Sequence, residues 1–175
     1  TLALTLGIKV EDDPYADPEP MPSARIAWQP NSTTLFWGAV SRALRSPTPF
    51  DDDVVEKQGT QVFLAGNPNF RPEGLTAYEA GYKGLIAPQV SLSVSGYWDV
   101  YDHLKSIELS PTVFPLLWGN TMEGKIYGVQ SSVDVQVAPW WRLSAGLTTL
   151  REDMRFKPGA SGLLGTAQAG DDPHF

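Results

Sequence analysis

The sequence contains no cysteine among its 175 residues. This absence excludes a disulfide framework, a thiolate metal site and a cysteine nucleophile. A surplus of positive charge is absent as well, because 13 Lys and Arg stand against 20 Asp and Glu, for a formal net charge of -7. Proteins that follow a phosphate backbone need Lys and Arg to displace counterions, so this charge argues against nucleic-acid binding.

Long hydrophobic runs are also missing. No stretch approaches the ~20 apolar residues that a membrane-spanning helix needs. The first ten residues have no basic segment followed by an apolar one, so we see no signal peptide and expect the chain to begin inside a longer precursor. A barrel strand needs only ~9 to 11 alternating residues, and a membrane location therefore stays open.

What the chain does contain favours strands and turns. With 16 Gly, 15 Pro, 6 Trp and 6 Tyr, it is poor in helix formers and rich in residues typical of sheets and bends. Residues 89–99, 126–137 and 141–150 alternate between an apolar and a polar or small side chain, which is the period of a two-faced strand. Together with residues 2–10, 24–28, 33–41 and 78–83, they predict an all-β fold of about seven strands.

The connections between these strands alternate in length. Short turns containing Pro or Asn are predicted at residues 29–32, 87–88 and 138–139. Long polar connections are predicted at residues 11–22, 42–73, 101–123 and from 151 onward. Such alternation is typical of an antiparallel up-and-down sheet with tight turns at one rim and long loops at the other, as in outer-membrane barrels. The alternative, a soluble β-sandwich binding module, would mix loop lengths at both ends.

Aromatic residues gather near both ends of the predicted strands. Near short turns lie Trp28, Trp140 and Trp141, and near long loops lie Tyr97, Trp98 and Tyr101. This distribution is typical of the two aromatic girdles of a membrane barrel, although Trp also occurs in the core of soluble β-domains. The polar face is mainly Ser, Gly and Gln, which suits a crowded polar lumen.

Two sequence motifs resemble those of one family. Residues 33–47, TTLFWGAVSRALRSP, resemble the barrel strand of TonB-dependent receptors that ends in S-R-A-x-R-x-P and opens a long extracellular loop. Residues 66–82 are similar to the motif G-N-P-x-L-x-P-E-x-x-x-x-Y-E-x-G-Y of the same family, with Phe70 in place of Leu. Residues 170–175 resemble a further loop segment. The resemblance covers residues 23–175, and two motifs in the same order are more specific than one.

The resemblance implies a 22-stranded outer-membrane barrel closed by an N-terminal plug domain. With about seven strands, residues 1–175 are expected to form part of that barrel, without the plug and the remaining strands. The implied function is import of a scarce ligand such as an iron-siderophore complex, driven by a TonB-type partner acting through the plug, in the outer membrane of a Gram-negative bacterium. We expect no cofactor, contact with outer-membrane lipid, no activity from the isolated fragment, and self-association through its unpaired sheet edges.

The same motifs supply the candidate site residues. The resemblance gives a structural role to the signature positions Ser41, Asn67, Pro68, Pro72, Glu73, Tyr78, Glu79 and Gly81. Arg42, Arg45 and Arg71 flank the long loop and suit an anionic ligand. In the alternative interpretation, these arginines pair with residues 51–53 or with Glu73 and hold the base of the loop.

No catalytic or metal-binding residue is predicted. Asp51, Asp52 and Asp53 with Glu56 lack the Gly-punctuated spacing of a calcium loop, so a solvated acidic loop is favoured. His103 is interpreted as a loop histidine without a ligand role. A hydrolase would need two converging carboxylates or a Ser–His pair, and neither is indicated by the sequence, so we expect a protein that is not an enzyme.

Overall fold

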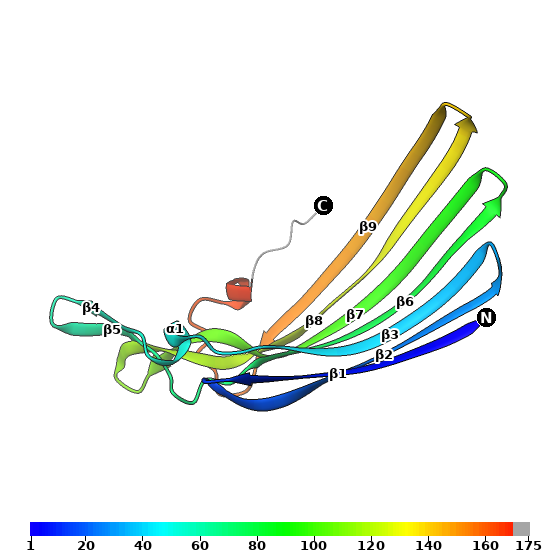
Figure 1. The fold of residues 1–175 in the computed structure, drawn as a ribbon. Coiled ribbons are helices and arrows are strands. Elements are labelled where there is room, and N and C mark those ends of the chain that lie inside the picture. Colours follow the sequence, from blue (N-terminus) through cyan, green and yellow to red (C-terminus); the bar gives the residue numbers. More distant parts are fainter. Residues whose placement is uncertain (170–175) are drawn as a thin grey trace.

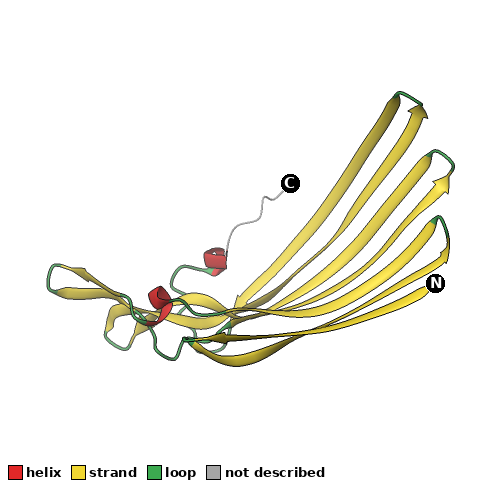
Figure 2. Cartoon of the chain, in the orientation of Figure 1, coloured by secondary structure: helices red, strands yellow, loops and turns green. Residues whose placement is uncertain are grey.

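The computed structural model describes residues 1–169, and strands make up most of it (Figure 2). Seven long antiparallel strands lie side by side in one curved sheet (Figure 1). They are β1 (Leu2–Asp13), β2 (Ala16–Asn31), β3 (Thr34–Arg45), β6 (Glu73–Ala87), β7 (Val90–Ser110), β8 (Val113–Ala138) and β9 (Trp141–Phe156). The predicted all-β class and strand number are confirmed. A single curved sheet also replaces the two packed sheets of the sandwich alternative.

Four shorter elements accompany these strands. The connection from β3 to β6 contains α1 (Pro49–Asp52), β4 (Val55–Gln58) and β5 (Gln61–Ala65), and η1 (Thr166–Ala169) follows β9. The 26-residue β8 is long enough to pair with β9 along one part and, through Leu116 and Leu117, in parallel with β5 along another. The described residues include no helix that is both long and apolar enough to cross a membrane.

Three tight turns define the short-turn rim. They occur at residues 32–33, 88–89 and 139–140 and join β2 to β3, β6 to β7 and β8 to β9 (Figure 1). In the first turn, Asn31 Oδ1 accepts hydrogen bonds from the backbone N–H and the hydroxyl of Thr33, at 3.0 and 2.9 Å. This is an Asx-type turn, which explains why Asn predicts a bend here.

At the opposite, long-loop rim, two predicted loops are wrong. Residues 11–22 form a hairpin that turns at residues 14–15, and residues 101–123 form one that turns at residues 111–112. Register shifts separate Tyr101 from Leu104 and Leu104 from Ser106, and His103 has a φ of 57°. Each such bulge adds a residue on one strand. The two-residue period is therefore lost where β7 continues, and the sequence pattern ends too early.

The first hairpin separates from the rest of the sheet at this rim. Pairing between β2 and β3 ends at Ser23 and Ser41, although both strands continue toward the rim. Pro20 and Pro22 lie just beyond this point on β2. Alternate residues direct their amides to the same edge of a strand, and proline has no N–H to donate there. β2 therefore keeps β1 as its neighbour and leaves a crevice toward β3.

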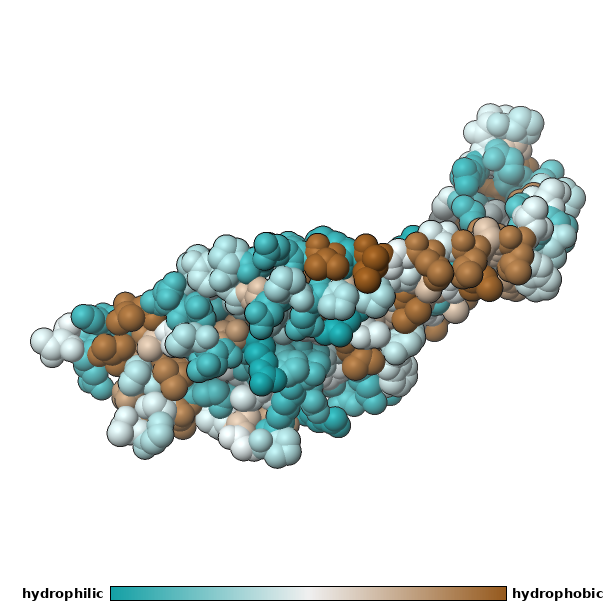
Figure 3. Space-filling model, turned by 60° about the horizontal axis from the view of Figure 1, so that its bottom comes forward, coloured by the Kyte–Doolittle hydropathy of each residue, from teal (hydrophilic) through white to brown (hydrophobic). Residues whose placement is uncertain are grey.

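The register places most of the apolar residues of the seven long strands on one surface. Trp28 pairs with Phe36, Phe36 with Tyr82, and Tyr82 with Val94. This surface is the convex side of the sheet, and Figure 3 shows hydrophobic residues gathered in a row along part of the molecule. Tyr97 and Tyr101 have the opposite parity and lie on the concave surface, so their predicted place in an outer girdle is wrong.

Buried hydrophobic side chains lie at the long-loop rim and not within the curved sheet. In the part of the chain that the structure describes, they are Met21, Leu64, Phe70 and Met122. By contrast, β1 alone exposes Leu2, Leu4, Leu6, Ile8 and Val10, each at 60–72%. A surface of this kind requires apolar surroundings, because soluble monomers rarely expose continuous apolar patches of this extent.

Gly81 makes room for an aromatic ring on the concave face. A Cβ at this position would lie 2.5–2.7 Å from ring atoms of Trp37, its partner on β3. We predict that Gly81→Ala lowers the free energy of unfolding by about 1–3 kcal/mol, measured by urea denaturation. Gly96→Ala is the matched control, because a Cβ there would be 3.7 Å from its nearest neighbour. Adding Trp37→Ala should recover part of the loss, and no recovery would contradict this explanation.

Candidate functional site

The convex surface changes character sharply toward the long-loop rim. Trp98 and Tyr127 are cross-strand partners whose rings stack at 4.8 Å, and Tyr78 lies beside Trp98 on β6. Lys125 occupies the next convex position of β8 toward the long-loop rim. Its Nζ lies 5.2 Å from the centre of the Trp98 ring and 3.5 Å from the Asp153 carboxylate. An apolar band followed by aromatic rings and then by charged pairs is the profile of a membrane–water interface.

A second group of rings lies toward the short-turn rim. Trp28 stacks on Phe36 at 5.4 Å, and Phe36 contacts Tyr82 at 5.2 Å. Trp140 and Trp141 stack at 6.2 Å at the turn between β8 and β9. The apolar band therefore lies between two aromatic belts, as on the outer surface of a transmembrane barrel.

The concave surface is polar. One row of cross-strand partners runs from Arg25 through Ala39, Glu79 and Tyr97 to Gly128. The next row toward the long-loop rim contains Ser41, Asp99 and Glu152. Small and charged side chains on this side match the polar lumen that the sequence predicts, with apolar residues alternating to the outside.

A buried carboxylate anchors the long loop. Asp51 in α1 is 1% exposed and accepts hydrogen bonds from Lys105 Nζ at 2.5 Å and from the Thr48 hydroxyl at 2.8 Å. Arg45 Nη1 lies 3.7 Å from the same carboxylate. Burial raises the pKa of Asp51, but the hydrogen bonds from Lys105 and Thr48 outweigh it and hold the pKa below its ordinary value.

Lys105 connects this loop to the hairpin formed by β7 and β8. Its ammonium lies 3.6 Å from the centre of the Trp118 ring and 5.2 Å from that of Phe50. The ammonium of Lys105 therefore has an acid on one side and aromatic faces on the other. The long loop and the β7–β8 hairpin, which are far apart in the sequence, therefore meet at one side chain.

The Gly-Asn-Pro signature builds the return path of the loop. Asn67 Nδ2 donates to the Trp118 carbonyl, and Asn67 Oδ1 accepts from the Asn69 N–H, both at 2.9 Å. A Cβ on Gly66 would lie 2.2 Å from the Asp52 carbonyl oxygen, so no larger residue fits. Pro68 follows Asn67 directly, and the next residues lead to Phe70, which is 5% exposed. The signature closes the loop on itself and on β8.

The remaining signature residues are distributed along β3 and β6. Pro72 precedes Glu73, whose carboxylate accepts hydrogen bonds from Arg45 Nε at 2.5 Å and from the Lys105 N–H at 2.6 Å. Ser41, Glu79 and Gly81 lie on the concave face, and Tyr78 lies in the outward belt. The two motifs thus meet at the base of one loop.

The three candidate arginines lie in different surroundings. Arg42 has the parity of the convex face and pairs with Glu19 at 2.5 Å. Arg45 has the concave parity, and the hydrogen bond from its side chain to Glu73 raises its pKa. The Arg71 N–H donates to Asn120 Oδ1 at 2.7 Å, and its guanidinium has no ion-pair partner within residues 1–169.

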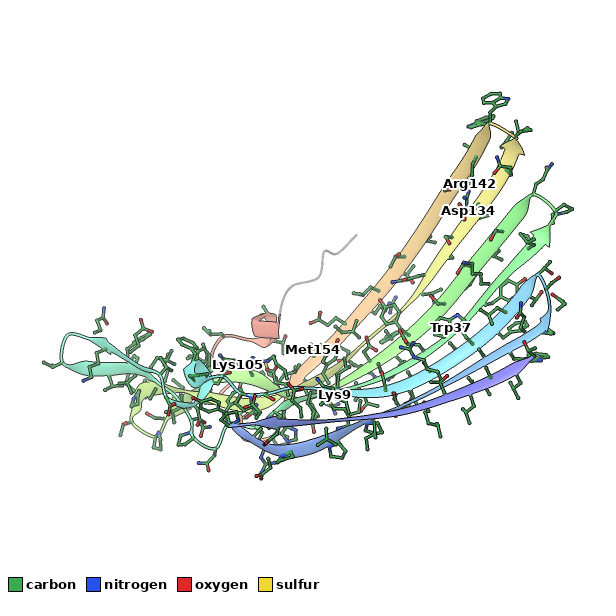
Figure 4. The ribbon with its side chains drawn as sticks, viewed as in Figure 1. Lys9, Trp37, Lys105, Asp134, Arg142 and Met154 are labelled. Carbon is green, nitrogen blue, oxygen red and sulfur yellow. The ribbon has the colours of Figure 1, made fainter. Side chains whose placement is uncertain are left out.

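A concave pocket of about 420 Å³ lies beneath the loop base. It is lined by Arg45, Glu73, Tyr101, Leu104, Lys105, Ile126 and Met154, and Figure 4 shows Lys105 and Met154 on this side of the sheet. Two cations and an aromatic ring therefore border this pocket between the loop base and the curved sheet. Sequence reasoning missed Lys105, Tyr101 and Met154, because no motif marks them and bulges obscure the parity of β7.

The other groups considered from the sequence make different contacts. The Asp51 carboxylate is engaged by Lys105. His103 Nδ1 lies 3.1 Å from Asp102, which also pairs with Lys157. Among residues 1–169 no three His, Asp or Glu side chains converge as a metal site would require. His174 and the similarity of residues 170–175 to a family loop fall outside the described residues.

Comparison with known proteins agrees with this geometry. The model of the TonB dependent receptor-like β-barrel family matches residues 1–173. The siderophore receptor PirA from Pseudomonas aeruginosa is similar in structure, with a TM-score of 0.73 and 16% identity over 87% of this chain. A mutant ferric enterobactin receptor (PfeA) from Pseudomonas aeruginosa, in complex with enterobactin, has a TM-score of 0.74 and 15% identity over 85%. The copper transporter OprC has a TM-score of 0.60 and 16% identity over 78%. No curated protein sequence matches significantly.

The single curved sheet, its two aromatic belts and its polar concave face define part of an outer-membrane β-barrel. The chain belongs to the TonB-dependent receptor family, whose members are transport receptors in the outer membrane of Gram-negative bacteria. It spans 31% of the PirA chain, 24% of the PfeA chain and 21% of the OprC chain. The predicted family, barrel fold and outer-membrane location are confirmed.

The contact between Asp51 and Lys105 predicts an acid-sensitive loop. Because the pKa of Asp51 is lowered on folding, its stabilisation is present above the ordinary aspartate pKa of about 3.9 and is lost as pH falls through the lowered value. Asp51→Asn should destabilise the loop base by on the order of 3 kcal/mol at neutral pH.

Hydrogen exchange of residues 46–72 measures this effect. Exchange protection in the unmodified protein should decrease in acid, whereas Asp51→Asn should lack it already at neutral pH. Asp53→Asn, a change at an exposed neighbour, is the matched control and should keep the protection. Equal protection in the Asp51→Asn and Asp53→Asn variants would show that the buried pair does not anchor the loop.

The apolar band predicts that arginine substitutions at two adjacent residues of β8 differ in how much they destabilise the protein. Val133 lies on the convex face, between Leu92 and Ala145, and Ser132 lies on the concave face. Val133→Arg should destabilise the protein in lipid by about 2–4 kcal/mol, because it places a cation against hydrocarbon. Ser132→Arg should destabilise the protein much less, because its side chain lies on the concave face. The comparison requires reversible urea unfolding in vesicles, and similar losses for both variants would contradict the assignment of faces.

Proposed function

We propose that this chain is a portion of the barrel of an active importer whose ligand is a small anionic metal chelate, such as a ferric siderophore. The observation that supports this proposal most directly is the concave pocket, in which Arg45 and Lys105 lie beneath an anchored loop. Two of the similar structures are receptors for siderophores or for ferric enterobactin by their titles. Cations with several N–H donors suit chelates that carry carboxylate or catecholate oxygens.

In this proposal the long loop and the pocket have separate tasks. The segment from α1 to β5 forms part of the outer surface on which the ligand is captured. Arg45 and Lys105, each already paired with an acid, lie at the point where a ligand leaves the loop and enters the lumen. Because their charges are partly compensated, binding there would be weak enough to allow the ligand to pass.

Transport also requires parts that other segments of the receptor would supply. We propose that a plug domain and the remaining strands complete the barrel, and that a TonB-type inner-membrane partner acts on the plug. β1 and β9 are the outermost long strands of the described sheet, and each has a free edge where further strands would pair. In the isolated chain these two edges would instead pair with other copies and would give no transport.

Uptake by the complete receptor tests the function. Cells that depend on it should accumulate ferric siderophore, and Arg45→Gln should reduce binding of the siderophore by about tenfold, the effect of losing one charge-assisted hydrogen bond. Dissipating the inner-membrane potential should stop accumulation while leaving binding at the surface intact.

Controls separate the pocket from the rest of the barrel. Arg25→Gln changes another cation of the concave face, three cross-strand rows from Arg45, and should reduce binding less than Arg45→Gln. Accumulation that continues without an inner-membrane potential would contradict active import. Failure to bind any ferric chelate would overturn the proposed ligand class.

A further inference from the structure

The two cations of the concave pocket are each paired with an acid, and the two acids belong to different parts of the fold. Glu73 is the first residue of β6, and its carboxylate accepts hydrogen bonds from the side chain of Arg45 and from the backbone N–H of Lys105. Asp51 lies in α1, a four-residue helix within the connection from β3 to β6. One acid therefore belongs to the barrel wall, and the other belongs to the loop.

The barrel holds Lys105 independently of the loop. Its backbone N–H donates to Glu73 at 2.6 Å, and its ammonium lies 3.6 Å from the centre of the Trp118 ring on β8. From the loop side, α1 covers the same ammonium with the Asp51 carboxylate at 2.5 Å and with the Phe50 ring at 5.2 Å. Departure of α1 would thus uncover a lysine that stays in place.

Asp51 contacts both cations of the pocket at once. Its Oδ1 accepts a hydrogen bond from Lys105, and its Oδ2 lies 3.7 Å from Arg45 Nη1. The two cations and the two acids, Asp51 and Glu73, have opposite charges that cancel, so removal of Asp51 leaves one positive charge uncompensated. The Asp51 carboxylate therefore supplies the negative charge that an anionic group of a ligand would supply in this pocket.

An anionic ligand has little room at Lys105 while Asp51 is bound. The lysine side chain is 26% exposed, with the acid on one side and the rings of Trp118 and Phe50 on others. A ligand oxygen that binds the ammonium must therefore take the place of the Asp51 carboxylate. The Trp118 ring also carries a buried Nε1–H without a hydrogen-bond partner within residues 1–169, so one donor beside the ammonium is unused.

Displacement of the Asp51 carboxylate would move α1 as a whole. Asp51 is 1% exposed, and a buried carboxylate without a compensating cation is strongly unfavourable, so the displaced acid must move into water. The same carboxylate accepts hydrogen bonds from the N–H and the hydroxyl of Thr48, at 2.9 and 2.8 Å, which ties it to the start of the helix. Occupancy of the pocket is thereby coupled to the position of α1.

We propose that Asp51 is an internal competitor of the imported ligand. In the ligand-free receptor its carboxylate occupies Arg45 and Lys105, and an anionic ligand in the pocket displaces it and releases α1 from β7 and β8. This coupling is reciprocal, because the ligand weakens the anchoring of α1 by the same factor by which Asp51 weakens binding of the ligand. The inference rests on the proposed function, in which an anionic ligand enters this pocket.

Anion binding by the complete receptor tests the competition. Citrate, a small carboxylate trianion, is the probe, and its affinity is measured by isothermal titration calorimetry. Asp51→Asn should raise this affinity about tenfold, which is a typical coupling between two sites. Asp53→Asn removes the same charge at an exposed neighbour and should leave the affinity unchanged. Adding Lys105→Gln to Asp51→Asn should remove most of the gain, because the two anions compete for that ammonium.

Hydrogen exchange measures the release of α1. Citrate should lower the protection of residues 49–54 in the unmodified receptor. Sodium chloride at the same ionic strength should have a much smaller effect, because a buried ion pair is screened little by salt. Residues 61–65 of the same loop are the internal control, since β5 is paired with β8 through Leu64 and Ala65 and should keep its protection.

The outcomes separate this inference from the proposed function. The competition is overturned if citrate fails to bind, if Asp51→Asn and Asp53→Asn bind it equally, or if it binds without lowering the protection of α1. A gain that persists after Lys105→Gln would overturn the role of the ammonium. Ferric enterobactin and ferric citrate are measured in parallel. Failure of both to bind, while citrate releases α1, would overturn the proposed ligand class and support the competition.

Discussion

The continuous cross-strand register is the constraint on which this structure depends. Between β2 and β9, partners remain aligned through the middle of every strand, and the shifts occur near turns or beyond Tyr101. Since side chains alternate between faces, a slip of one residue on any strand would move its apolar set into the lumen. The register thus creates the apolar band, both aromatic belts and the polar concave surface together.

The long-loop rim is stabilised by a different principle. The curved sheet buries little, so the segments beyond it rely on Asp51, Lys105 and the rings of Trp118 and Phe50. A second cluster acts similarly where Ser106, 0% exposed, and Thr121 donate to Glu108, whose carboxylate also accepts the Ser161 N–H at 2.7 Å. Hydrogen bonds from Thr121, Ser161 and Ser106 outweigh burial and lower the pKa of Glu108. The loops at this rim are therefore held together by small clusters of hydrogen-bonded polar side chains, whereas the curved sheet exposes its apolar convex face.

The sequence predicts the fold wherever the two-residue period is intact. Residues 126–137 and 141–150 alternate cleanly, and the structure has β8 and β9 there. The extension of β7 was not predictable, because bulges around His103 break the period. The pairing of Asp51 with Lys105 was not predictable either, since 54 residues separate them and only the folded hairpin brings them together. Motifs indicated that Asn67 and Glu73 are structural, without indicating which atoms they bind.

The parity of β3 explains why one motif supplies residues to both surfaces. β3 continues to Arg45, four residues beyond its predicted end at Ser41. Arg42 and Arg45 are three residues apart, and an odd separation on a continuous strand places them on opposite faces. Val40 is convex, so Arg42 lies toward the lipid and Arg45 toward the lumen. The spacing in S-R-A-x-R thus divides its cations between the convex and the concave surface, a division that depends on where the strand ends.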